Sequence, residues 1–168
     1  MNITLRAIEP SDLDSVLKWE NDSSAWDYSD VVAPLSRRIL QDYIASYNAD
    51  PFAEGQLRLI IADGQDNPLG IADLYDISAI HAHAFVGIYV DPEQRNKGIA
   101  TESLTLLCEY AIHRLGIRTL AALILPENNI SINLFTKYGF KHSGTLPSWR
   151  RTASGFSDVE IFTLHHPR

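Results

Sequence analysis

The sequence predicts an α/β (α+β) domain in which a mixed sheet of about seven strands carries helices on both faces. Segments with period-two alternation and segments with helical spacing follow one another in the order β-α-α-β-β-β-α-β-α-β-β. The three successive strands favour a meander, and the later β-α-β unit requires a parallel crossover, which is right-handed in proteins. The 168 residues contain no repeat, linker or low-complexity stretch, so we expect one domain over residues 1–168.

The expected strands are short apolar segments bounded by turn residues. The first alternates at Ile3, Leu5 and Ala7, and Ser154-Gly155 forms the turn between the last two. The seven strands cover residues 1–9, 55–63, 69–77, 81–90, 119–125, 140–149 and 157–164.

The expected helices follow from apolar residues spaced three and four apart. Pro10, Ser11 and Asp12 begin the first, which carries Leu13, Val16, Leu17 and Trp19. The second follows Pro34, with Leu35, Ile39, Tyr43, Ile44 and Tyr47 at helical spacing. A long helix covers 98–115 and ends at Gly116, and a short one covers 129–138.

The composition excludes several classes of protein. A formal net charge of −7 argues against nucleic acid as a general partner, because phosphate binding needs a basic face, and is compatible with a cationic substrate. Cys108 is the only cysteine, so no intrachain disulfide can form. There is neither a signal-peptide core at the N-terminus nor an apolar run of about 18 residues, so we expect no membrane span and a cytoplasmic location.

The most informative stretch is Asp91 to Glu102, DPEQRNKGIATE, where a strand meets the long helix. Gly98 has no side chain, so the amides around it can approach a ligand closely. First-turn N–H groups lack intrahelical partners, and the helix dipole is positive there. With the cations of Arg95 and Lys97, these amides form a candidate pyrophosphate site. Alternatively, the turn is an ordinary connection whose basic residues face water.

Two motifs together resemble the N-acetyltransferases of the GNAT family. The first is VGIYVDP at 86–92 followed by Arg95-x-x-Gly98-x-Ala100, which is similar to the family's acetyl-CoA loop. The second begins about 40 residues later at Asn128 and ends in Gly139-Phe140, with Ser131, Phe135, Lys137 and Tyr138 between them. Within the family, the chain looks most like the branches that acetylate ribosomal-protein N-termini or spermidine.

The resemblance implies that acetyl-CoA is the cofactor and lies in a gap beside the strand before the loop. Backbone groups of that strand would pair with pantetheine, and the loop amides would hold the pyrophosphate. Residues implied to bind the cofactor are Ile88, Tyr89, Val90, Arg95, Asn96, Lys97, Gly98, Ile99, Ala100, Thr101, Asn128, Ser131, Phe135 and Lys137. Phe135 and Tyr138 could instead fill the core, unless Ile130 and Leu134 supply that contact.

Attack of an amine on a thioester needs a base for the ammonium proton and a donor for the leaving thiolate. Many relatives carry a tyrosine acid where this chain has Phe135, so Ser131 and Tyr138 are the candidate acids. Relatives also often carry a glutamate on the strand 84–90, which holds no carboxylate here. Asp73 and Asp76, on opposite faces of the preceding strand, are the nearest acidic candidates, and Asp73 is favoured as the base; alternatively, both are solvated. His81 and His83 share one face and could serve instead, but without a third ligand we expect no metal site.

The resemblance implies that the acceptor contacts the loop 21–34 and the turn between the last two strands. Trp26, Asp27, Tyr28 and Asp30 suit a cation, and Trp149 would close the opposite wall. These aromatic residues could equally pin the loop. The resulting prediction is acetyl transfer to a primary amine, a polyamine-like small molecule or else a peptide N-terminus. A non-catalytic acyl-CoA-binding module is the alternative from another class, and a homodimer through an edge strand or the late hairpin is compatible with the sequence.

Overall fold

A computed structural model describes residues 2–167. Its helices are α1 (Leu13–Glu20), α2 (Arg37–Ser46), α3 (Pro51–Glu54), α4 (Ile99–Glu109) and α5 (Asn129–Tyr138). Its strands are β1 (Thr4–Ala7), β2 (Leu57–Ala62), β3 (Pro68–Ser78), β4 (His83–Val90), β5 (Thr119–Ile124), β6 (Lys141–Thr152) and β7 (Gly155–His165). Short 3-10 turns are η1 (Pro10–Asp12), η2 (Ser23–Tyr28) and η3 (Pro92–Gln94), and the π turn η4 (Tyr110–Arg114) extends α4.

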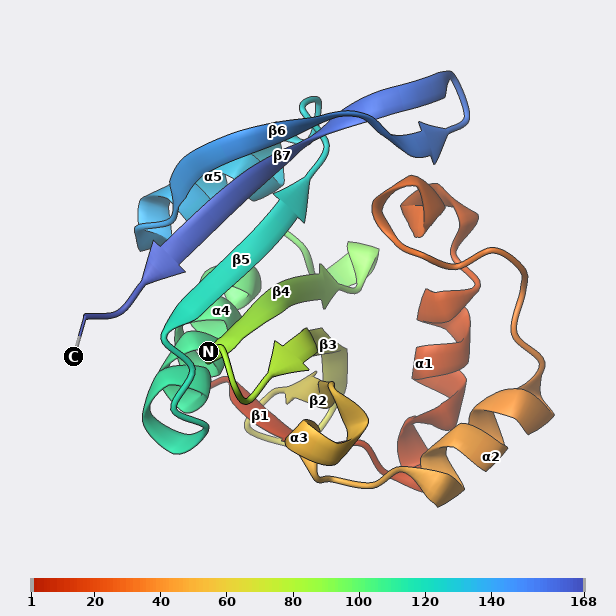
Figure 1. The fold of residues 1–168 in the computed structure, drawn as a ribbon. Coiled ribbons are helices and arrows are strands. Elements are labelled where there is room, and N and C mark those ends of the chain that lie inside the picture. The colour runs from red at the N-terminus through yellow and green to blue at the C-terminus, as the bar shows by residue number, and fades with distance from the viewer. Residues whose placement is uncertain (1, 168) are drawn as a thin grey trace.

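The seven strands form one sheet in the order β1-β2-β3-β4-β5-β7-β6. Every neighbouring pair is antiparallel except β4 and β5, which are joined by the crossover through α4. Figure 1 shows α1 and α2 on one side of the sheet and α4 on the other. The predicted fold class, a mixed seven-stranded sheet with helices on both faces, is confirmed.

Two apolar clusters hold the layers together. The larger one packs α4 and α5 on the sheet and includes Leu74, Val86, Leu107 and Phe140. The smaller one packs α1 and α2 on the other face, around Val16, Trp19, Leu40, Ile60 and Ile71. Because side chains alternate along a strand, Ile71 and Tyr89 face α1 while Ala72 and Val90 face α4.

Some local predictions differ from the structure. The helix α3 was not expected, because four residues are too few to show a helical period; Asp50 caps it and Pro51 occupies its first turn. In α2 the residue buried most deeply is Leu40, whereas Ile39 is 49% exposed. Ala7 is exposed and Ile8 is buried, so the alternation of the first strand changes phase at its end.

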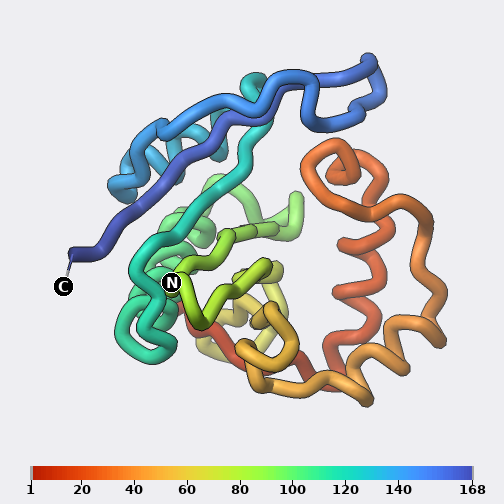
Figure 2. The backbone as a smooth tube through the Cα atoms, in the orientation of Figure 1, coloured from red at the N-terminus to blue at the C-terminus, as the bar shows by residue number. Residues whose placement is uncertain are grey.

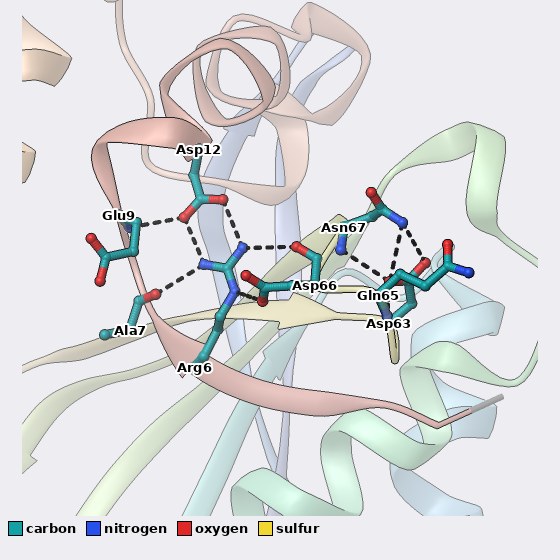
Figure 3. A network of polar contacts seen from close by, with 8 residues as sticks. All are labelled: Arg6, Ala7, Glu9, Asp12, Asp63, Gln65, Asp66 and Asn67. Carbon is teal, nitrogen blue, oxygen red and sulfur yellow. Dashed lines mark hydrogen bonds and ion pairs between the residues drawn. The ribbon is translucent and has the colours of Figure 1, made fainter.

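An ion pair fixes the start of α1 on the sheet (Figure 3). Arg6 of β1 donates to both oxygens of Asp12, at 2.8 and 2.9 Å, and Asp12 also accepts from the Glu9 amide at 2.8 Å. Arg6 contacts Asp66 in the β2–β3 turn as well. Asp12 is 1% exposed, and these donors supply the partners that a buried carboxylate needs.

Within residues 2–167, no helix has the length and apolar character to cross a membrane.

Candidate active site

The central feature of the site is the gap between β4 and β5. The two parallel strands pair only from His83 to Phe85, opposite residues 119–121. Residues 86–90 of β4 remain paired with β3, and residues 122–124 of β5 remain paired with β7. Within the described residues, the facing edges of 86–90 and 122–124 therefore have no strand between them. Such an edge accepts an extended chain with amide groups, as pantetheine has.

A glycine keeps β4 close to β3 on the other side of this gap. Gly70 pairs with Val90, and a Cβ at position 70 would lie 2.1 Å from the carbonyl oxygen of Tyr89. Real Cβ atoms do not approach an oxygen so closely, so a larger residue at position 70 would disturb the pairing of β3 with the end of β4.

The loop after β4 presents backbone amides at the start of α4. Asn96 and Gly98 both have a left-handed backbone, with φ of 64° and 79°, and Gly98 is the N-cap of α4. A Cβ at position 98 would meet nothing within 4 Å, so the backbone conformation, not crowding, favours glycine here. Arg95 donates to the Val90 carbonyl at 3.1 Å, and Lys97 contacts Gln94 at 2.8 Å. The turn can hold an anion.

The helix α5 brings the second motif to α4. Asn128 caps α5 by accepting from the Ser131 amide at 3.2 Å, and Ser131 is half-buried. Phe135 is only 5% exposed and meets Phe140 edge to face, with ring centroids 5.0 Å apart. Phe135 is thus a core residue. Ile130, which could have supplied that contact, is 84% exposed, so that alternative is wrong for Ile130. Lys137 is exposed.

Tyr138 is occupied by a contact inside the protein. Its hydroxyl lies beside the thiol of Cys108 in α4, and burial, followed by the effect of Cys108, raises the pKa of Tyr138 to about 12. Burial likewise raises the pKa of Cys108 to about 12. The Tyr138 hydroxyl therefore points towards α4. Of the two acid candidates, Ser131 is the one whose hydroxyl lies at the first turn of α5.

Asp73, the candidate base, is bound by a guanidinium. Arg58 of β2 donates to both oxygens of Asp73, at 2.9 and 2.8 Å, and also to Glu20 at the end of α1, at 2.5 Å. Asp73 faces α1 and lies beside Gly87 of β4, where a Cβ would be 3.7 Å from that of Asp73. Asp76 is exposed, with a left-handed φ of 47°. Asp73 therefore lies on the α1 side of the sheet, where it forms an ion pair with Arg58.

The predicted acceptor segments do come together (Figure 2). The loop after α1 and the β6–β7 hairpin lie side by side, and Arg150 of β6 joins them. Its guanidinium donates to the Ser29 carbonyl at 3.2 Å and pairs with Asp30 at 3.4 Å. Tyr28 of the loop and Trp149 of β6 are 53% and 62% exposed.

Two further residues predicted to contact the acceptor, Trp26 and Asp27, lie in the 3-10 turn η2. Trp26 donates to the Glu20 carbonyl at 3.1 Å, which ties the turn η2 to the end of α1. Asp27 lies beside it in η2 and is half-buried. Trp26 therefore pins the loop, which is one of the two roles that the sequence predicted for these aromatic residues.

Aromatic side chains line the sheet below this loop. Tyr75 and Phe85 stack with centroids 5.5 Å apart, and burial, then the nearby Asp30, raise the pKa of Tyr75 to about 12. A hollow of about 290 Å³ adjoins Phe85 at the paired end of β4 and β5, and His81 and His83 line it with their rings stacked 6.0 Å apart. Among residues 2–167 no cluster of three or more His, Cys, Asp or Glu could hold a metal ion.

Sequence reasoning missed the residues that act across long distances in the chain. Arg58, Arg150, Tyr75 and Glu20 carry no local motif, and their partners lie on other elements. A charged residue inside a strand facing the helices, as Arg58 is, was the one available signal, because such a charge requires a partner.

Comparison with known proteins identifies the family. The model for the acetyltransferase (GNAT) domain matches residues 2–141. A spermidine N(1)-acetyltransferase from Vibrio cholerae serotype O1 is 26% identical over 144 residues, covering 86% of this chain and 82% of the relative. The enzyme of the same name from Escherichia coli K12 is 27% identical over 147 residues, covering 86% and 76%.

Solved structures show the same fold. The spermidine N-acetyltransferase of Vibrio cholerae in complex with CoA and spermine superposes with a TM-score of 0.86 at 24% identity, covering 98% of this chain and 95% of that chain. A dodecameric structure of the Vibrio cholerae enzyme, in an intermediate state, has a TM-score of 0.83 at 24% identity and covers 98% and 94%.

Proposed function

This chain belongs to the GNAT acetyltransferase family, and from that premise we propose that its acceptor is a primary amine of a polyamine. The family defines the enzyme class, an N-acetyltransferase, and the cofactor, acetyl-CoA. The reaction moves the acetyl group from the CoA sulfur to the amine nitrogen, which loses a proton while CoA leaves as the thiol.

The observation that carries the proposal is the chemistry of the acceptor side. Three aspartates lie within the loop after α1, at positions 22, 27 and 30, together with Trp26 and Tyr28. Glu20 and Asp73 add two carboxylates on the same side of the sheet, and the guanidiniums that face these five acids belong to Arg58, Arg150 and Arg95. The excess of negative charge beside aromatic rings suits a flexible polycation. The names of the two spermidine acetyltransferases support the same class.

For the cofactor side, we propose that the amides of residues 95–101 hold the pyrophosphate and that β4 residues 88–90 pair with pantetheine. Arg95 and Lys97 would add charge-assisted contacts, and the Asn128 side chain would touch the cofactor at the cap of α5. Ser131 is our proposed donor to the leaving sulfur, since the Tyr138 hydroxyl lies beside the buried thiol of Cys108. Phe135, which is buried against Phe140, supports α5 from the core.

The test is release of the CoA thiol from acetyl-CoA with a panel of acceptors: spermidine, spermine, aminoglycosides, amino acids and short peptides with free N-termini. We expect turnover on spermidine or spermine at least tenfold above the peptides. Mass spectrometry of the product would identify one added acetyl group on a primary nitrogen.

Other results would redirect the proposal. Turnover on peptides alone would assign the enzyme to N-terminal acetylation and leave the acidic loop without its proposed role. Tight CoA binding without acetylation of any amine would favour a binding module. We also propose that the chain self-associates, as the dodecameric Vibrio cholerae enzyme does, and light scattering of the purified protein would measure it.

A further inference from the structure

The Tyr89 side chain of β4 contacts residues on both the cofactor side and the acceptor side of the site. Its backbone belongs to the stretch facing the β4–β5 gap, and its ring points to the α1 side of the sheet. There the hydroxyl donates to Asp22 Oδ2 at 3.2 Å, and the Arg95 guanidinium lies over the ring, 5.8 Å from its centroid. A guanidinium at this distance from a ring is attracted to its face.

Asp22 connects Tyr89 with the loop 21–34, which we call the acceptor loop. Its other oxygen, Oδ1, accepts from the Ser24 amide at 3.0 Å and from the Ser24 hydroxyl at 2.6 Å, and so caps η2. The turn η2 contains Trp26, Asp27 and Tyr28. One carboxylate therefore orders the acceptor loop with one oxygen and binds β4 with the other.

Neighbouring contacts hold this junction in place. Trp19 of α1 packs 6.1 Å from Tyr89 and donates to Asp91 at 2.7 Å, at the beginning of the cofactor loop. Lys18 pairs with Asp91 and Glu93. These side chains line a hollow of about 280 Å³ between α1 and the loop after β4. The junction is thus built, with partners on three elements.

The charges around the Tyr89–Asp22 contact indicate how a bound cofactor would affect the acceptor loop. The Ser24 hydrogen bond is the largest influence that lowers the pKa of Asp22, with Tyr89 and the Arg95 charge adding to it. A pyrophosphate bound to Arg95 would neutralise that positive charge. The acceptor loop would then experience a more negative potential, which favours a cationic amine.

We propose that Tyr89 is a positioning residue that couples the two substrates, so that a bound cofactor raises the affinity of the acceptor through Arg95, Tyr89 and Asp22. The substrate part of this inference rests on the proposed function. The effect of the cofactor on the order of the loop does not depend on which acceptor binds. By reciprocity, a bound acceptor raises the affinity of CoA by the same factor.

The experiment compares wild type with Tyr89→Phe, which keeps the ring and loses the hydroxyl, and with Asp22→Asn, which keeps an acceptor for Ser24 and loses the charge. Tyr110→Phe, an exposed tyrosine on the π turn after α4, is the matched control. Calorimetry measures the Kd of spermine with and without CoA. Amide hydrogen exchange of residues 22–30, with and without CoA, reports on the loop without any acceptor.

We expect CoA to tighten spermine binding at least fivefold and to slow exchange in 22–30 for wild type and Tyr110→Phe. In Tyr89→Phe and Asp22→Asn the spermine factor should fall below twofold and the loop should lose its CoA-dependent protection, while CoA still binds. If the substitutions cause only a structural defect, both ligands will bind more weakly, but the ratio of the spermine Kd without CoA to the spermine Kd with CoA will keep its wild-type value. That result would overturn the proposal. If spermine fails to bind wild type but CoA protects the loop, the acceptor assignment fails and the coupling stands. If CoA leaves the wild-type loop unprotected, the coupling is refuted.

Discussion

Arg58 and Asp73, on adjacent strands, form a bidentate ion pair in which one guanidinium donates to both carboxylate oxygens, at 2.9 and 2.8 Å. The same guanidinium holds Glu20 at the C-terminal end of α1. The contact fixes the beginning of the acceptor loop to the sheet. It also gives the candidate base a competing, structural task.

Replacing Asp73 with Asn separates these two tasks. If Asp73 anchors, Asp73→Asn should weaken folding by about 1–2 kcal/mol and raise the acceptor KM, because the charge-assisted pair is lost from a half-buried position. The kcat should stay within about tenfold and the pH–rate profile should keep its acidic limb. Asp76→Asn, on the exposed part of the same strand, is the control. Disappearance of the acidic limb, with a loss of kcat above a hundredfold, would instead make Asp73 the base.

The two acid candidates give opposite expectations. Ser131→Ala should lower kcat by about 10- to 100-fold with little change in the KM for acetyl-CoA, as expected for loss of a proton donor. Tyr138→Phe should leave kcat nearly unchanged, because its hydroxyl lies beside the buried thiol of Cys108 and burial raises its pKa to about 12, which makes it a weaker proton donor. Steady-state kinetics from pH 6 to 9 measure both. A large kcat effect in Tyr138→Phe alone would reverse the assignment.

The sequence predicted the local structure of the proposed cofactor site, the loop before α4 and the helix α5, because the signals for both are local. Arg95, Gly98 and Ala100 lie within six residues, and backbone amides need little beyond a glycine and a helix start to form the site. The second motif also predicted α5 with the bounds observed, Asn129–Tyr138. Neither inference depended on contacts with other parts of the chain.

The acceptor side was not readable in this way. Arg150 and Ser29 are 121 residues apart, and Tyr89 and Asp22 are 67 apart, so only the folded sheet brings them together. The sequence identified the loop 21–34 as acidic and aromatic, but could not show that Asp30 is paired with Arg150. Nor could it show that Phe135 is buried against Phe140, since Phe at that spacing suits a cofactor wall and a core equally well.

Substitutions at Gly98 test the cofactor loop. Gly98→Glu places a carboxylate beside the amides that we expect to hold the pyrophosphate, and should abolish measurable CoA binding while the protein stays folded. Any L-residue at a φ of 79° adds strain of about 1 kcal/mol, which asparagine tolerates better than most. Gly98→Asn is therefore the control for strain, with CoA affinity expected within about tenfold of wild type. Calorimetric titration with CoA and circular dichroism measure binding and folding, and undiminished affinity in Gly98→Glu would refute the loop assignment.

The Arg6–Asp12 pair predicts a pH dependence of stability. Burial alone would raise the pKa of Asp12, but the hydrogen bonds from Arg6 and the Glu9 amide outweigh it and hold the pKa below its ordinary value. A depressed carboxyl pKa stabilises the folded state above the unfolded pKa, near 3.9, and this stability is lost as the pH falls through the folded pKa. Asp12→Asn should therefore lower the free energy of unfolding by about 3 kcal/mol at pH 7, because it leaves Arg6 without its main partner.

The matched control is Asp66→Asn, which removes the other, 74% exposed partner of Arg6 and should cost under about 1 kcal/mol. Urea unfolding at several pH values between 3 and 7 gives the difference between wild type and each variant. For Asp12→Asn the difference should shrink as the pH drops below about 4, since protonation then removes the same charge from the wild type. A difference that stays constant down to pH 3, or equal losses in the two variants, would show that the buried carboxylate is not the partner that anchors α1 to β1.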